Sequence, residues 1–156
     1  MKPTLGIKWF VGFVGISTLL LGMMACGGGS EAVKIGLLTP QTGPIAQYAP
    51  GFADAAKVAI SELNVTHEGD FEFELIVANS GCDATEAATA AQTLIDSGVS
   101  VIIGAACSGA TLSAITVAAA AGVPMVSYAS TSPAVTTADD NGHLFRVVPS
   151  DAQQAV

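Results

Sequence analysis

Short apolar runs alternate along most of the chain with longer segments of helical periodicity. Five runs have the length and composition of β-strands, namely residues 33–39, 71–78, 99–104, 123–128 and 144–148. Between the runs, apolar residues recur three and four positions apart, which predicts helices over 51–64, 83–97 and 108–121. Residues 83–86 (Asp-Ala-Thr-Glu) are close to a capping box that opens the helix over 83–97, and Asp151 is expected to be the N-cap of a further helix.

Strict alternation of strands and helices predicts a parallel sheet with helices on both faces. Because such crossovers are right-handed, the expected architecture is a doubly wound α/β sheet. The roughly 130 residues that follow the N-terminal segment suffice for one core of this kind. The sequence therefore predicts one α/β domain over residues 33–156.

The first 25 residues follow a different pattern. Lys2 and Lys8 precede an apolar run over residues 9–24, and the small residue Ala25 stands directly before Cys26. This is the three-part layout of an export signal. A membrane span needs about 20 apolar residues, and this run is shorter and rich in glycine. We expect a signal peptide over residues 1–25; the alternative is an uncleaved anchor helix, which leaves the rest of the chain on the same side.

Residues 21–26 (Leu-Gly-Met-Met-Ala-Cys) resemble a lipobox, in which Cys26 becomes the lipidated first residue. Met23 stands where leucine is usual. Residues 26–32 then read as a flexible spacer between the lipid and the folded domain. Cys82 and Cys107 remain, and an even pair in an exported chain favours a disulfide over two separate buried thiols.

Charge excludes one class of partner. All thirteen acidic residues follow Cys26, together with only Lys34, Lys57 and Arg146, so this part of the chain has a net charge of −10. Such a surface repels phosphate backbones, and no nucleic acid is expected as a partner. His67 and His143 have no cysteine or carboxylate at ligand spacing, so no metal site is expected.

In an open doubly wound sheet, ligands bind beyond the carboxyl ends of the strands. The loops expected there are residues 40–50, 80–83, 105–108 and 129–133. Ser108 opens a helix, where unpaired N–H groups and a partial positive charge suit an anion. The alternative is that Ser108 merely caps its own helix, a role that is compatible with anion binding. Residues 129–133 add exposed backbone groups and hydroxyls without a charge.

Enzymatic functions fit the sequence poorly. Residues 104–111 nearly trace a phosphate-binding P-loop, but Ala110 replaces the lysine that pairs with a triphosphate. No G-x-G-x-x-G motif follows the first strand, which disfavours a dinucleotide cofactor. A serine hydrolase needs a base near its serine, and His67 and His143 are remote in sequence. We therefore expect a protein that is not an enzyme and has no cofactor.

Ordered groups of residues resemble the leucine/isoleucine/valine-binding proteins, the solute receptors of branched-chain amino-acid ABC transporters. The groups are residues 35–44 (Ile-Gly-Leu-Leu-Thr-Pro-Gln-Thr-Gly-Pro), Gln47-Tyr48 with Gly51, residues 104–111, residues 123–136, and Leu144-Phe145-Arg146 with Pro149 and Asp151. Together they cover nearly all of the chain after the signal. The resemblance implies the N-terminal lobe of a type I periplasmic-binding fold.

The resemblance also implies site residues. Ser108 would hold an amino acid's carboxylate with its hydroxyl and backbone N–H, and Thr131 would share that carboxylate. The carbonyl of Ala129 would accept from the ammonium group, Tyr48 would form a wall of the side-chain pocket, and Asp151 lies near the family's first crossing between lobes. Cys82 and Cys107 match the positions of a family disulfide.

The function implied is an extracytoplasmic solute-binding lipoprotein that binds a branched-chain or related amino acid for import through a membrane permease. It would sit in the periplasm or on the outer face of the cell membrane, held by its lipid. The family has two lobes that close on the ligand, and this chain matches only the first, so we expect a truncated chain that binds weakly. The alternative is a ligand-sensing regulatory domain of the same fold.

Overall fold

The computed structural model describes residues 32–154 of the 156-residue chain, so the predicted signal peptide and Cys26 lie outside the described residues. The strands are β1 (Val33–Thr39), β2 (Phe73–Asn79), β3 (Val101–Ile103), β4 (Met125–Ser127) and β5 (Leu144–Arg146). The helices are α1 (Ala49–Thr66), α2 (Ala84–Asp96), α3 (Ser108–Ala120) and α4 (Asp151–Gln154), with single 3₁₀ turns at η1 (Ala46–Tyr48) and η2 (Pro133–Val135). No helix in this part of the chain is long and apolar enough to cross a membrane.

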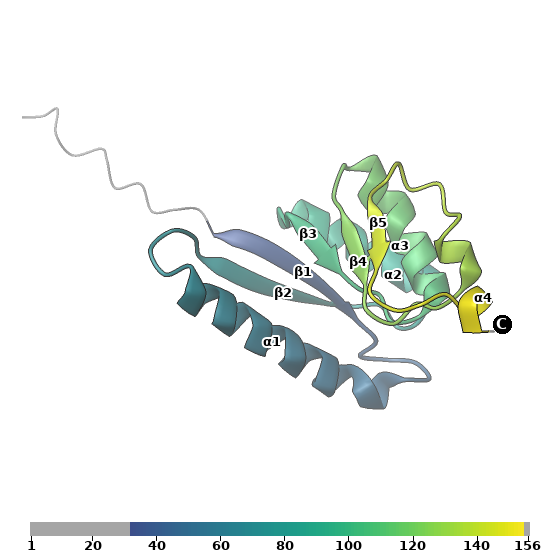
Figure 1. Cartoon of the computed structure of the whole chain (residues 1–156), viewed down its shortest axis with the longest axis horizontal. Helices are drawn as coiled ribbons and strands as arrows, with labels where there is room; N and C mark the ends of the chain where they lie inside the picture. The colour runs from purple at the N-terminus through teal and green to yellow at the C-terminus, as the bar shows by residue number, and fades with distance from the viewer. Residues whose placement is uncertain (1–31, 155–156) are drawn as a thin grey trace, which may run out of the picture.

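All five strands are parallel, in the order β2-β1-β3-β4-β5. The chain moves outward from β1 to β2, then crosses back over β1 to β3 and continues to β5. Because each crossover is right-handed, this reversal places α1 on one face and α2 and α3 on the other. Figure 1 shows α1 alongside β1 and β2, with α2 and α3 behind the sheet. The predicted doubly wound α/β fold is confirmed.

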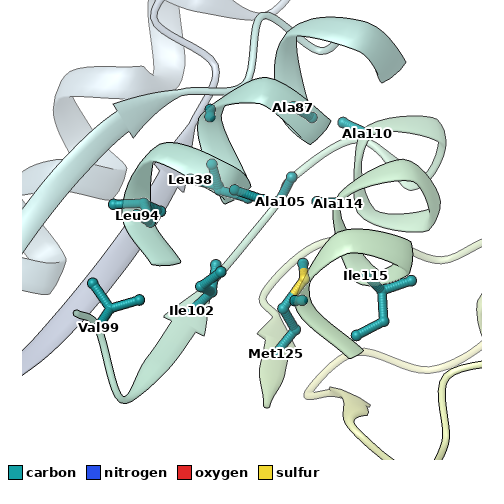
Figure 2. Close-up of a cluster of buried hydrophobic side chains, with 13 residues drawn as sticks. Leu38, Ala87, Leu94, Val99, Ile102, Ala105, Ala110, Ala114, Ile115 and Met125 are labelled. Atoms are coloured by element: carbon teal, nitrogen blue, oxygen red, sulfur yellow. The ribbon is translucent and has the colours of Figure 1, made fainter. Parts of the chain in front are cut away.

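The hydrophobic core lies between the sheet and the pair α2 and α3 (Figure 2). Its large side chains are each at most 1% exposed and come from both layers: Leu38, Leu94, Ile102, Ile115 and Met125. Elsewhere small residues predominate, and a Cβ added at Gly36 would lie only 2.9 Å from Leu94. The buried sides of α2 and α3 consist largely of alanines, which permit the helices to approach closely: Ala87, Ala90, Ala91, Ala110, Ala114 and Ala118.

Element ends depart from the hydrophobic pattern where turns intervene. The predicted strand over 99–104 is shorter in the structure, where β3 covers Val101–Ile103 and Val99 N donates to Leu94 O in the turn that ends α2. Helix α1 begins at Ala49, two residues before the predicted start at Gly51, with Pro50 in its first turn, where the missing N–H is not needed. Asp83 caps α2 as predicted, since its carboxylate accepts from Thr85 N and Glu86 N.

The opposite face of the sheet is only partly covered. Helix α1 packs on β1 and β2, and a hollow of about 350 Å³ lies beside it, lined by Leu37, Phe52, Ala55, Ala56, Ile103 and Tyr128. Further along this face, Phe145 in β5 is 56% exposed. The register pairs Phe145 with Val126 and Val126 with Ile103, so these apolar side chains form one row across the face.

Substitutions on the two faces should therefore differ in cost. Leu38→Ala removes a fully buried side chain and should lower the free energy of unfolding by about 2–5 kcal/mol. Phe145→Ala removes an exposed ring and should lower it by less than about 1 kcal/mol. Urea denaturation followed by circular dichroism measures both. Equal losses would contradict the assignment of the core to the α2 and α3 side.

Candidate functional site

The candidate site lies beyond the carboxyl ends of the strands, where the order reverses between β1 and β3. A disulfide between Cys82 and Cys107, with Cα atoms 5.3 Å apart, joins the loop after β2 to the loop after β3. The predicted bridge is thus present, and separate buried thiols are excluded. Since Cys107 directly precedes Ser108, the bridge anchors the start of α3.

Ser108 is the first residue of α3 and its hydroxyl does not cap the helix. The N-cap is Cys107, which makes no side-chain capping bond. Ser108 Oγ instead accepts from Ser132 N at 3.3 Å, so its proton is free to be donated elsewhere. Within residues 32–154, the backbone N–H groups of Ser108 and Gly109 have no partner. Three donors therefore gather at the positive end of a helix of 13 residues.

Thr131 supplies groups of the opposite kind. Its hydroxyl donates to Asp151 Oδ2 at 3.0 Å, and its carbonyl accepts from Asp151 N at 2.9 Å. The hydroxyl oxygen keeps lone pairs for accepting, next to an exposed carboxylate. The carbonyl of Ala129 and the N–H of Thr131 have no partner in the described part of the chain. This loop therefore offers acceptors around Ala129 and Thr131 Oγ1, and one backbone donor.

A cluster of buried hydroxyls ties the two loops together beneath these groups. Ala105 O accepts from Ser127 Oγ at 2.8 Å and from Ser130 Oγ at 3.2 Å. Thr111 Oγ1 accepts from Ala105 N at 3.1 Å and lies 2.8 Å from Ser130 Oγ. Thr111, Ser127 and Ser130 are fully buried. Each satisfies a backbone group that would otherwise be buried without a partner.

Tyr48 stands apart from these groups, at the start of α1. Its side chain is 56% exposed, and its ring centroid lies 6.5 Å from that of Phe52. Phe52 in turn lies 4.8 Å from Tyr128, whose hydroxyl donates to Leu38 O at 3.0 Å. Burial raises the pKa of Tyr128 to about 12. An aromatic row thus runs from the site toward the hollow beside α1.

The structure brings together four of the five candidate ligand residues. Ser108 and the loop that holds Ala129 and Thr131 are joined through Ser132 N, and Asp151 is bonded to Thr131. No hydrogen bond in the described region links Tyr48 to any of them. The structure places Tyr48 in η1, after the carboxyl end of β1, and its part in the site stays a prediction.

Sequence reasoning assigned no role to several residues that shape this site. They are Arg146, Tyr128 and the buried hydroxyls of Thr111, Ser127 and Ser130. One signal was available for Arg146, which is the one arginine in the sequence. Ser127 and Thr111 are polar residues inside an apolar strand and an alanine-rich helix, which is a second usable signal.

The arrangement can hold a small molecule that has both a carboxylate and hydrogen-bond donors. The donors and acceptors of the site are mostly backbone groups and hydroxyls, and within residues 32–154 Asp151 is the one carboxylate hydrogen-bonded to the loop of residues 129–133. In residues 32–154, no three His, Cys, Asp or Glu side chains are grouped as a metal site would require.

Comparisons with known proteins agree with this geometry. A family model described as "Periplasmic binding protein" matches residues 32–156. The "Leucine-, isoleucine-, valine-, threonine-, and alanine-binding protein" of Pseudomonas aeruginosa is 29% identical over 128 residues, which cover 80% of this chain and 34% of that protein. This chain therefore spans about a third of the length of that relative.

Solved structures give the same picture. The substrate-binding protein LivJ of a branched-chain amino acid transporter from Streptococcus pneumoniae, in complex with isoleucine, has a TM-score of 0.70 and 29% identity, covering 78% of this chain and 35% of that one. A solute-binding protein of an ABC transporter from Rhodopseudomonas palustris, in complex with 3,4-dihydroxy benzoic acid, has a TM-score of 0.69 and 27% identity, covering 78% and 33%.

The raised pKa of Tyr128 gives a prediction about pH. Because burial disfavours the phenolate, the unfolded chain loses this proton near pH 10 and the folded chain near 12. The free energy of unfolding should therefore be constant below pH 10 and should fall as the pH rises from 10 to 12, because the unfolded chain loses the proton first. The difference in phenolate absorbance between the wild type and Tyr128→Phe should titrate near pH 12. A midpoint near 10 would mean that this phenol is solvated.

Proposed function

The chain belongs to the periplasmic binding protein family, and on this basis we propose that it forms one lobe of an extracytoplasmic receptor for an amino acid. The family consists of binding proteins rather than enzymes. The ligand class proposed is a branched-chain or related α-amino acid. The observation that carries the proposal is the set of unpartnered groups around Ser108 and Thr131, because these groups match both charges of a zwitterion.

The carboxylate of the ligand would lie against the start of α3. Ser108 offers its backbone N–H and its hydroxyl proton, and the N–H of Thr131 comes from the facing loop. Donors that are already fixed and lack other partners bind a carboxylate without the cost of breaking internal bonds. Thr131 would thus share the carboxylate through its backbone, because its hydroxyl proton is directed at Asp151.

The ammonium group of the ligand would lie on the acceptor side of the same site. Ala129 O is unpartnered, and Thr131 Oγ1 keeps lone pairs that can accept. The exposed carboxylate of Asp151, bonded to that hydroxyl, adds negative potential at this point. Asp151 therefore contributes to ligand binding through Thr131 in this proposal, and it needs no direct contact.

The ligand's side chain would extend toward Tyr48, whose exposed ring is available to pack on it. Discrimination by pocket volume is modest, since one methylene is worth about 1–3 kcal/mol. The two related structures hold isoleucine and 3,4-dihydroxy benzoic acid, so this fold accepts side groups of different shape. A lobe that spans about a third of its relatives would leave one side of the ligand in water, and binding by this chain alone should be very weak.

The cellular role we propose follows from the same premise. Cys26 would be lipidated after removal of residues 1–25, which holds the receptor in the periplasm or at the outer face of the membrane. Residues 26–32 would serve as the spacer. A receptor of this kind delivers its amino acid to the membrane permease of an ABC transporter, which is the partner we propose. No nucleic acid is involved.

A titration of the labelled full chain with L-leucine, followed by NMR in detergent micelles, tests the ligand proposal. The amide signals of Ser108, Gly109 and Thr131 should shift with a midpoint in the millimolar range, as weak binding by one lobe requires. Ser108→Ala should weaken the response about tenfold, because a donor to the carboxylate is lost. Ser113→Ala, the same substitution further along α3, should leave it unchanged.

Analogues separate the two halves of the site. 4-Methylpentanoate lacks the ammonium group and leucinol lacks the carboxylate, so each should shift these amides less than leucine at equal concentration. An equal response to leucinol would remove the role given to the start of α3. Micromolar affinity for leucine would contradict the weak binding expected of one lobe.

Lipidation is tested by expressing the full gene in a bacterium. The wild-type chain should partition into the detergent phase of a cloud-point extraction, and mass spectrometry should find an acylated N-terminal peptide that begins at Cys26. Cys26→Ser should abolish the acylated peptide. An unmodified peptide that still contains residues 1–25 would instead support the uncleaved anchor helix.

A further inference from the structure

Arg146 at the end of β5 reaches the loop that carries Ala129 and Thr131. Its Nη1 donates to Ser132 O at 3.0 Å and to Ser130 O at 3.4 Å. Its Nη2 donates to the hydroxyl of Thr136. One guanidinium therefore spans the two carbonyls that flank Thr131, as its planar fork of donors allows.

Fixing a carbonyl also fixes the N–H that follows it. A trans peptide unit directs its C=O and the next N–H in opposite directions. The bond from Arg146 to Ser130 O therefore turns the N–H of Thr131 away from Arg146, and this N–H has no partner in the part of the chain that the structure describes. The same rule accounts for its neighbour: Asp151 N holds Thr131 O, and Ser132 N points the other way to Ser108 Oγ.

We propose that Arg146 is a positioning residue for ligand binding, which aims the backbone N–H of Thr131 at the ligand's carboxylate. The inference rests on the proposed function, because that N–H is a ligand donor only if an anion occupies the site. The cation also polarises the peptide unit between residues 130 and 131, which makes its N–H a stronger donor. The effect reaches the ligand through the backbone and requires no contact with Arg146.

The loop has other anchors, so it stays folded without Arg146. Ser130 belongs to the buried hydroxyl cluster, and Ser132 Oγ caps η2 by accepting from Ala134 N. Thr136 provides the control variant, because Thr136→Val removes a bond from the same guanidinium but leaves the carbonyls of residues 130 and 132 held. If ligand binding depended only on how firmly Arg146 is held, Arg146→Gln and Thr136→Val would both weaken it. If it depends on the direction of the Thr131 N–H, only Arg146→Gln should weaken it.

The test compares Arg146→Gln, Arg146→Lys and Thr136→Val in leucine titrations of the labelled full chain, with amide and carbonyl chemical shifts as the readout. Arg146→Gln should raise the titration midpoint about tenfold, as expected for one charge-assisted bond lost from the aim of a ligand donor. Arg146→Lys keeps the positive charge but lacks the planar fork of donors that reaches both carbonyls. Its titration midpoint should therefore lie between those of the wild type and Arg146→Gln. Thr136→Val should stay within about twofold of the wild type.

A midpoint for Arg146→Gln within twofold of the wild type would overturn the proposal, as would an equal loss in Thr136→Val. Should Arg146→Gln unfold, the intermediate loss in Arg146→Lys decides the question. Should the wild type show no response to leucine, the proposed function fails, and the ligand-free spectra then decide the positioning role. In that case Arg146→Gln must shift the carbonyl signals of Ser130 and Ser132 and the amide of Thr131 while Thr136→Val does not; unchanged signals would overturn it.

Discussion

A trans peptide unit directs its carbonyl and its N–H in opposite directions, so a partner on one side determines what is offered on the other. The loop after β4 uses this constraint at each step. Ser127 Oγ holds the N–H of Ser130, which leaves Ala129 O free, and Asp151 N holds Thr131 O, which leaves Ser132 N to bind Ser108 Oγ. Within residues 32–154, the unpartnered groups of this loop, Ala129 O and Thr131 N–H, thus belong to peptide units whose other polar group is hydrogen-bonded.

These fixed units depend in turn on the sheet. The reversal of strand order at β1 brings the loops after β3 and β4 to one edge, and the disulfide joins the first of them to the loop after β2. Large side chains would keep those loops apart. The buried layer between them is therefore made of small hydroxyl residues, Thr111, Ser127 and Ser130, which fill the space and also satisfy the backbone.

The sequence was sufficient for the elements and the fold, because period and alternation report directly which face of an element is buried. Asp83 as a helix cap and the pairing of Cys82 with Cys107 followed from local chemistry and from cysteine count. Strand ends were less accurate, since an apolar residue such as Val99 is buried whether or not it is hydrogen-bonded as strand. The part that the sequence could not give is the direction of each polar proton. Ser108 looked equally suited to capping its helix, and only the path of the facing loop supplies Ser132 N as its partner.

The same reasoning explains how a strongly acidic lobe could accommodate a carboxylate. Thirteen acidic residues outnumber three basic ones after Cys26, and the one arginine is held by two carbonyls and a hydroxyl. A ligand anion in this site would interact with dipoles in the first turn of α3, which act at short range. Charges elsewhere on the surface are screened by salt, so the net charge of the lobe has little effect on that anion. An arginine in direct contact would attract any anion, whereas in our proposal Arg146 acts only through the peptide unit between residues 130 and 131. In that arrangement the cation would strengthen the Thr131 N–H as a donor and would not face the acceptor groups proposed for the ligand's ammonium.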